Sequence, residues 1–308
     1  MLSWKKGRPI ARVMGGKKGK SLIRLLTDDD KDAKKDAVGL EDVFDLIDDD
    51  VFSIKGLGKR LKFKDIMRLR KCLIKNKKPK DGVLQPTFKK IMDKVDKKKQ
   101  KEIVIHSGEI HQVPNPDTRD CIYISGASGA GKSVYTGKYL AQYKKMFPKN
   151  PIFIFSRVEE DVALDYLNPT RILIDDDFVL DPIKLEELKN SCCVFDDVDT
   201  IIDKKRKEAV QGLRNCVLEM GRHHAIYCVS TSHQMMNYRE SKILLSESTN
   251  TVFFPRSGAV YHIKRFLKEY CGLEKDQIAR ILKLPSRWVS ISKTYPQFVM
   301  YDKGIYIV

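Results

Sequence analysis

The sequence of 308 residues lacks the segments that carry proteins into or across membranes. Its beginning is basic and is interrupted by glycine and proline between Trp4 and Pro9, which does not fit an apolar secretory signal. No window approaches the ~18 consecutive apolar residues that a transmembrane helix needs. We therefore expect an intracellular protein with no membrane partner.

Cysteines spaced for a disulfide framework or a zinc site are also missing. The seven cysteines are odd in number and include no Cys-x-x-Cys pair. Four of them lie in apolar, strand-like runs, where thiols pack as small hydrophobes. His223, His224 and His233 have no cysteine or carboxylate partner at ligand spacing. We expect a reducing compartment, with neither zinc nor disulfides.

Acidic residues are scarce in one segment, although the whole chain has 41 of them and a net charge of +17. Residues 51–100 hold 18 basic and 4 acidic side chains, whereas residues 1–50 hold 11 of each. A field of this sign attracts a polyanion such as nucleic acid through phosphate contacts and counterion release. A solvated basic surface with no partner is the alternative interpretation.

Residues 126–133 read Gly-Ala-Ser-Gly-Ala-Gly-Lys-Ser, a complete match to the phosphate-binding loop of P-loop NTPases. An apolar, strand-like run precedes this loop and a helical stretch follows it, as the motif requires. Glycine lets successive backbone N–H groups and the helix N-terminus converge on phosphates. Lys132 is expected to reach the β and γ phosphates of ATP, and Ser133 to bind Mg²⁺. The expected nucleotide-binding residues are Gly126, Ala127, Ser128, Gly129, Ala130, Gly131, Lys132 and Ser133.

Composition divides the chain into three parts. Residues 1–40 show little periodicity and are predicted to be mobile, with at most a short element around residues 22–26. Apolar spacing under lysine-rich outer faces predicts a small basic helical module at residues 41–101. Residues 102–308 are predicted to form a P-loop ATPase domain with a C-terminal β-rich extension.

Alternating strand-like and helix-like segments within the last part predict an α/β fold, with a mostly parallel sheet covered by helices. The expected strands are 121–125, 152–156, 171–174, 192–196 and 225–231, and the expected helices are 132–146, 183–190 and 205–220. The apolar stripe of the last helix includes Val210 and Met220 and leaves Arg214 off the core face. After residue 285, short β-rich runs separated by turns predict a closing β-meander.

Two acids end the buried strand that begins at Cys192. Asp196 is the candidate ligand for Mg²⁺, and Asp197 is placed to polarise the attacking water. Asp199 is expected only to cap the next helix.

A second polar strand end follows, in Thr231-Ser232-His233-Gln234. Beside the phosphate-loop strand, such side chains can sense the γ phosphate. His233 and Gln234 point opposite ways if the chain is extended, so at most one is expected to face the nucleotide. Arg222, just before this strand, is a candidate to stabilise charge on the transferred phosphoryl group. Four further arginines compete with it, namely Arg214, Arg239, Arg256 and Arg287.

In this order, these motifs resemble the HerA/FtsK superfamily, and more closely the genome-packaging ATPases of large nucleocytoplasmic DNA viruses and their relatives. The residues that carry the resemblance are Ser125–Ser133, Phe195–Asp197, Gly221–His224, Thr231–Gln234, Phe254–Arg256 and Ser286–Val289. The resemblance covers roughly residues 102–308. One departure concerns the sensor: superfamily members often end this strand in Thr-Gln, whereas here His233 occupies the glutamine place and Gln234 follows it.

The resemblance implies an ATP-driven, ring-forming translocase that moves double-stranded DNA into a preformed capsid, with an arginine reaching across a subunit boundary. It further implies capsid portal or vertex proteins as partners, and host cytoplasm or the virion as the location. DNA would be gripped through its phosphates without reading the sequence. Two alternatives stay open: a P-loop nucleoside or nucleotide kinase, and a basic DNA-binding structural protein with a nucleotide switch.

Overall fold

The computed structural model describes residues 1–26, 101–237, 240–257 and 260–308. It also describes a few positions in between, namely residues 64, 68–69, 71–72, 77–82, 84–86 and 88–89. The basic helical module predicted at residues 41–101 lies mostly outside the described residues, so it stays a prediction.

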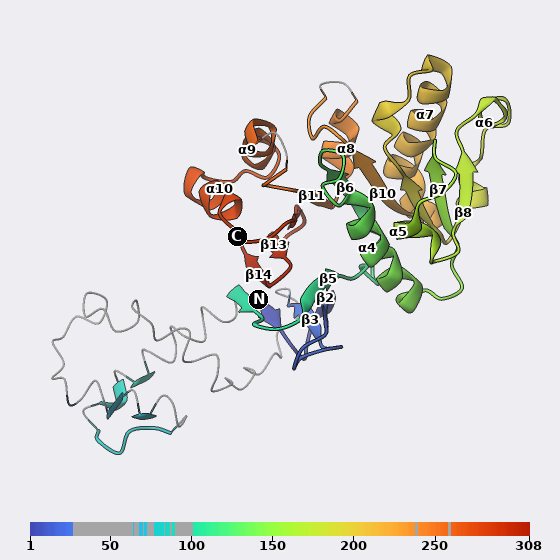
Figure 1. The fold of residues 1–308 in the computed structure, drawn as a ribbon. Helices are drawn as coiled ribbons and strands as arrows, with labels where there is room; N and C mark the ends of the chain where they lie inside the picture. The colour runs from blue at the N-terminus through green and yellow to red at the C-terminus, as the bar shows by residue number, and fades with distance from the viewer. Residues whose placement is uncertain are drawn as a thin grey trace.

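A ten-stranded sheet forms the centre of the chain, in the order β4-β14-β13-β12-β11-β6-β10-β9-β7-β8 (Figure 1). Its parallel strands are β11 (Asn250–Phe253), β6 (Cys121–Ser125), β10 (Tyr227–Ser232), β9 (Cys192–Phe195), β7 (Ile152–Ser156) and β8 (Thr170–Leu173). The antiparallel strands are β12 (Val289–Ser292), β13 (Phe298–Tyr301), β14 (Gly304–Ile307) and β4 (Glu102–Val104). The predicted α/β fold with a mostly parallel sheet and a closing β-meander is confirmed.

Helices cover both faces of this sheet. They are α4 (Lys132–Met146), α5 (Val162–Asp165), α6 (Asp176–Leu180), α7 (Lys204–Met220), α8 (Lys242–Glu247), α9 (Val260–Glu269) and α10 (Lys275–Leu282). The helix predicted at 183–190 is only a 3-10 turn, η2 (Leu185–Leu188). Lys184 has extended backbone angles, and Asn190 has a φ of 55°, so neither end continues a helix. Along the part of the chain that the structure describes, no helix is both long and apolar enough to cross a membrane.

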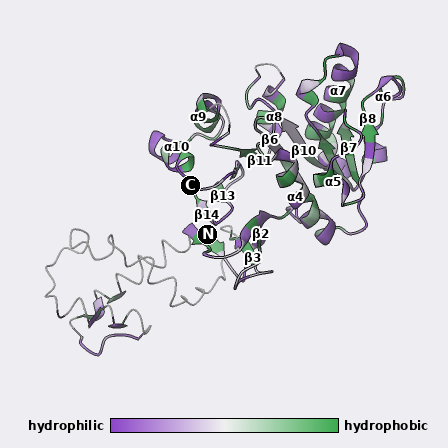
Figure 2. Ribbon diagram, viewed as in Figure 1, coloured by the Kyte–Doolittle hydropathy of each residue, from purple (hydrophilic) through white to green (hydrophobic). Residues whose placement is uncertain are grey.

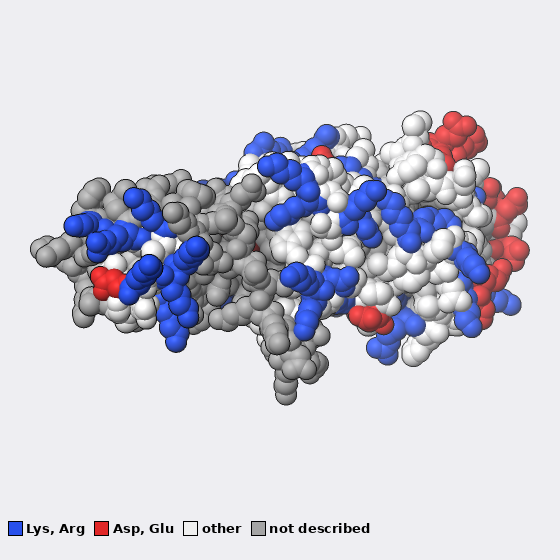
Figure 3. Space-filling model, turned by 90° about the horizontal axis from the view of Figure 1, so that it is seen from below, with Lys and Arg blue, Asp and Glu red and all other residues white. Residues whose placement is uncertain are grey.

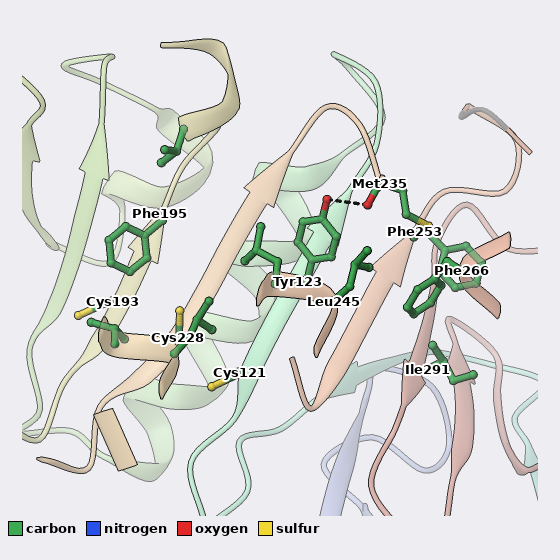
Figure 4. Packing of buried hydrophobic residues seen from close by; sticks show 14 of the residues in the cluster. Cys121, Tyr123, Cys193, Phe195, Cys228, Met235, Leu245, Phe253, Phe266 and Ile291 are labelled. Carbon is green, nitrogen blue, oxygen red and sulfur yellow. Dashed lines mark hydrogen bonds between the residues drawn. The ribbon is translucent and has the colours of Figure 1, made fainter. Parts of the chain in front are cut away.

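Alternate residues of β6 pack on opposite faces of the sheet, as the strand period of two requires. Cys121 and Tyr123 face the cluster under α7, α9 and α10, shown in Figure 4, whereas Ile122 and Ile124 face the cluster under α4. The Tyr123 hydroxyl donates to the Met235 carbonyl at 3.1 Å within the first cluster. Hydrophobic stretches lie along β7 in Figure 2, and hydrophilic ones on α6 and the outer side of α7.

The N-terminal residues form a second, four-stranded sheet in the order β1-β3-β2-β5, where we expected a mobile segment. Its strands are β1 (Leu2–Ser3), β2 (Arg8–Met14), β3 (Leu22–Leu25) and β5 (Glu109–Gln112). Val13 and Ile23 are fully buried and share a cluster with Ile110 and Met300. These apolar partners are supplied by β5 and the meander, roughly a hundred or more positions away, so local periodicity did not reveal the sheet.

Candidate nucleotide-binding site

The phosphate loop joins the carboxyl end of β6 to the first turn of α4. Gly129 and Gly131 have φ values of 72° and 114°, which favour glycine. A Cβ on Gly126 would lie 2.6 Å from Cδ2 of Phe254, a buried ring after β11. No side chain caps the N-terminus of α4. Its first N–H groups are therefore available to an anion, as in helix-terminal phosphate sites.

Lys132 and Asp197, both predicted from the sequence, lie together below this loop. The Lys132 ammonium donates to the Gly126 carbonyl at 3.1 Å and lies 3.4 Å from Oδ1 of Asp197. Its side chain is only 7% exposed, and these two partners fix the position of the ammonium group. The arrangement places a cation at the loop and a carboxylate directly behind it.

Thr231 links the two acids that end β9. Its Oγ1 lies 2.9 Å from Oδ1 of Asp196 and 2.9 Å from Oδ1 of Asp197, and it accepts a hydrogen bond from the Asp197 N–H at 2.8 Å. A hydroxyl has one proton, so it donates to one carboxylate at a time. Strand β10, which carries Thr231, lies between β6 and β9, so the polar ends of three neighbouring strands meet here.

The pKa of Asp196 is raised above its ordinary value, first by burial and then by the adjacent charge of Asp197. The hydrogen bond from Thr231 and the charge of Lys132 act in the opposite direction. Asp197 itself has left-handed backbone angles, φ 45° and ψ 40°, a conformation that aspartate adopts more readily than most residues other than glycine.

The residues predicted to bind Mg²⁺ fit that ion. Ser133, in the first turn of α4, and Asp196 offer oxygen atoms, which this hard cation prefers. A cation near Asp196 would also relieve its repulsion with Asp197, the second cause of the raised pKa.

His233 turns toward the acids, whereas Gln234 does not. Nε2 of His233 lies 3.6 Å from Oδ2 of Asp197, and Nδ1 lies 3.8 Å from Oδ1 of Asp199. The Gln234 residue is exposed, and its backbone carbonyl accepts the Tyr123 hydroxyl at 2.8 Å. Of the two candidate sensor residues, His233 therefore lies in the group around Asp197.

The prediction that Asp199 caps the next helix was wrong. Asp203 caps α7, accepting from the Arg206 N–H at 2.8 Å. Oδ2 of Asp199 instead accepts from the Ser232 hydroxyl at 3.1 Å and from the His233 N–H at 2.9 Å. Spacing in the sequence gave no sign of this contact, which joins residues that are more than 30 positions apart.

This contact brings together three side chains of the kind that bind cations. Asp197, Asp199 and His233 place one ligand atom each within 4.8 Å of one another. The spacing of residues in the sequence indicated no carboxylate partner for His233. The fold brings it close to Asp197 and Asp199, which lie more than 30 positions earlier.

The candidate arginines are widely separated. Arg222 is exposed in the 3-10 turn η4 (Gly221–His224) before β10, at the end of the sheet opposite to the phosphate loop. It therefore does not reach the loop of its own chain. Arg256 is exposed after β11, and Arg239 lies outside the described residues.

Of the candidate arginines that the structure describes, Arg287 contacts the loop. Its Nε donates to the Ala130 carbonyl and its Nη2 to the Gly129 carbonyl, each at 2.8 Å. The sequence offered this residue only as one of five competing candidates.

Arg214 is buried rather than turned away from the core, contrary to the predicted helix face. It is only 4% exposed, whereas Met220 is 52% exposed. The guanidinium donates to the Asn215 side chain, and nearby Glu240 and Asp199 favour its charged form. Burial is nevertheless the main influence and lowers the pKa of Arg214. Glu240 and Asp199 lie on other elements, so the helical pattern does not reveal them.

Comparison with known proteins gives one clear relative. The chain is 42% identical to the uncharacterized protein V3 of Sputnik virophage over 209 residues, which cover 67% of this chain and 84% of V3. No protein-family model matches the chain.

Among solved structures, the chain is similar to the genome packaging NTPase B204 of Sulfolobus turreted icosahedral virus 2 in complex with AMPPCP. The TM-score is 0.41 and the identity 13%, over 61% of this chain and 97% of B204. It is also similar to the pCW3 conjugation coupling protein TcpA, with a TM-score of 0.43 and 14% identity over 66% of this chain and 65% of TcpA.

Proposed function

This chain belongs to the family of protein V3 of Sputnik virophage, and we propose that it is an Mg²⁺-dependent ATPase that moves double-stranded DNA into a virus capsid. The observation that carries the proposal is the group formed by Lys132, Asp196, Asp197 and Thr231 at the ends of β6, β9 and β10. It combines a phosphate-binding lysine with two acids suited to hydrolysis.

ATP would lie on the phosphate loop, with its phosphates at the loop N–H groups and the start of α4. The triphosphate offers Lys132 a more strongly charged partner than Asp197. Once Lys132 moves to the phosphate, Oδ1 of Asp197 loses this ion pair and can accept a proton from the attacking water. Ser133 and Asp196 would hold Mg²⁺, which offsets the charge of the phosphate oxygens. His233, beside Asp197, would report whether the γ phosphate is present.

DNA movement is supported by the resemblance of the later motifs to the HerA/FtsK superfamily and by the basic charge of the chain. Arg222 lies away from its own phosphate loop. This position suits a residue that reaches the site of a neighbouring subunit in a ring. Capsid portal or vertex proteins as partners, and assembly in the host cytoplasm or virion, belong to the same proposal.

ATP hydrolysis with and without long double-stranded DNA tests the proposal, at two salt concentrations. The native chain is compared with Lys132→Ala and Asp197→Asn. We expect turnover that DNA stimulates, that weakens with salt, and that both substitutions abolish. Absence of ATP hydrolysis by the native chain would refute the proposed ATPase activity. Turnover that requires an added nucleoside would identify a kinase instead.

A further inference from the structure

The first 26 residues carry eight basic side chains and no acidic one. Residues 1–50 are neutral as a whole because all of their acidic residues lie at positions 28–50. The basic residues of this stretch lie on the N-terminal sheet and its turns: Lys5, Lys6, Arg8, Arg12, Lys17, Lys18, Lys20 and Arg24.

The turn between β2 and β3 carries lysines and packs against a second turn of the chain. Lys18 and Lys20 are exposed there. The turn packs closely on the β4–β5 turn, since a Cβ on Gly16 would lie 2.5 Å from the Ser107 hydroxyl and one on Gly108 would lie 2.6 Å from the Gly15 carbonyl. Two turns in contact at their backbones form a firm support for these cations.

The positive charge continues from this turn onto α4. Arg12 donates to the Lys20 carbonyl at 3.3 Å and to the Gln142 side chain of α4 at 3.0 Å. His111, the β5 partner of Arg12, is near Lys138 and Lys145 of α4, whose charges lower its pKa in addition to the larger effect of burial. We call Arg12, Lys18, Lys20, Lys138 and Lys145 the basic face.

Among the residues that the structure describes, most acidic side chains lie away from the basic face. Glu109, beside the basic face, binds Lys138 at 2.7 Å. Figure 3 shows Lys and Arg over the part of the molecule formed by the N-terminal strands and α4, whereas Asp and Glu gather mainly toward the α6 end of the sheet. The charges on this side of the described molecule are thus separated, as expected for a protein that binds a polyanion.

We propose that the basic face binds the phosphate backbone of double-stranded DNA. The inference rests on the proposed function and assigns its DNA contact to residues outside the segment at 51–100 that first suggested it. Lysine and arginine side chains can contact DNA phosphates whatever the base sequence is, and a translocase requires such sequence-independent contacts.

This location also links DNA to the nucleotide. The basic face is built partly on α4, and α4 begins with Lys132 of the phosphate loop. The N-terminal sheet contacts the same helix through the Tyr135 hydroxyl, which donates to Gln112 at 2.7 Å, and through the Arg12–Gln142 hydrogen bond. DNA bound to this face would therefore contact α4, the helix that begins at the phosphate loop. We expect this contact to change the rate of ATP hydrolysis.

The double substitution Lys18→Gln and Lys20→Gln tests the inference in the full chain. The matched control is Lys264→Gln with Lys268→Gln, which removes the same charge from exposed positions of α9. Affinity for a long duplex of mixed sequence is measured from 50 to 200 mM salt, together with basal and DNA-stimulated ATP hydrolysis. We expect the test variant to lose about tenfold or more in DNA affinity, with a salt slope lower by about 2, since each phosphate contact contributes about 0.9.

Basal turnover of the test variant should equal that of the native chain, whereas DNA stimulation should fall. If the native chain binds and responds to DNA but the test variant behaves like the control, the basic face is not the DNA contact and the proposed function stands. If the native chain hydrolyses ATP but neither binds nor responds to DNA, the DNA part of the proposed function fails and this inference fails with it.

Discussion

Arg287 holds the phosphate loop by donating from Nε to the carbonyl of Ala130 at 2.8 Å. A second bond from the same guanidinium reaches Gly129. These two bonds engage carbonyl oxygens of the loop and leave its N–H groups available to phosphates. They also place the positive charge of Arg287 close to the phosphate site. Because β12 begins two residues later, the C-terminal meander supports the nucleotide site.

Replacing Arg287 with alanine should weaken nucleotide binding about tenfold, since two bonds from a charged donor contribute roughly 1–2 kcal/mol. Arg287→Lys should recover only part of the affinity, because an ammonium cannot bind both carbonyls as a planar fork does. Titration with a fluorescent ATP analogue measures the effect. Arg265→Ala, at an exposed position on α9, is the control, and unchanged affinity in Arg287→Ala would contradict the role.

The Thr231 hydroxyl should set the acid limit of the ATPase. In Thr231→Val the side-chain shape is kept, but the Asp197 N–H loses its acceptor and Asp196 loses a bond that lowers its pKa. We expect kcat to fall roughly tenfold or more, at a cost of about 1–3 kcal/mol for unsatisfied buried groups. The pKa of Asp196 should rise, so activity should be lost at a higher pH than in the native chain. Thr231→Ser, which keeps the hydroxyl, should show the native pH profile; an unshifted profile in Thr231→Val would count against this account.

Gly126 and Gly129 should respond differently to alanine. At Gly126 the added methyl would meet the ring of Phe254 at 2.6 Å, whereas at Gly129 it meets open space and only the φ of 72° opposes it. We expect Gly129→Ala to cost about 1 kcal/mol of stability and Gly126→Ala about 1–3 kcal/mol together with nucleotide binding. Denaturant unfolding and ATP-analogue titration measure both. The double variant with Phe254→Leu should recover binding, and if it does not, the clash is not the cause.

The sequence predicted the site correctly where the residues that carry the chemistry also determine the local structure. The phosphate loop lies between β6 and α4 as predicted, and the predicted bounds of both elements agree with the structure. Asp196 and Asp197 lie at the end of a strand buried on both faces, as the apolar run of Cys192–Phe195 indicated. In each case, residues adjacent in the sequence determine both the structure and the chemistry.

Contacts between distant segments could not be predicted in this way. Nothing in the stripe of α7 reveals that Arg214 is buried near Glu240 and Asp199. Likewise, the contacts of Arg287 with residues more than 150 positions earlier depend on how the meander joins the parallel strands. The first strands were missed because β5 and the meander complete their core.

Asp120, which precedes β6, should make stability depend on pH. It is 4% exposed and accepts hydrogen bonds from the Asn115 N–H at 3.0 Å and the Tyr139 hydroxyl at 2.9 Å. Burial raises the pKa of Asp120 from 3.8 to about 6, more than these bonds lower it. The folded state therefore binds a proton more tightly than the unfolded state, and the free energy of unfolding falls as pH rises through this range.

In Asp120→Asn this dependence should disappear, because an amide does not titrate and its oxygen can still accept both bonds. Between pH 5 and 8 the free energy of unfolding of the native chain should fall by about 1–2 kcal/mol more than that of the variant. Urea unfolding at several pH values measures the difference. Asp117→Asn, at an exposed neighbouring position, should follow the native curve. Parallel curves for the native chain and Asp120→Asn would show that the Asp120 carboxyl keeps an ordinary pKa despite its burial.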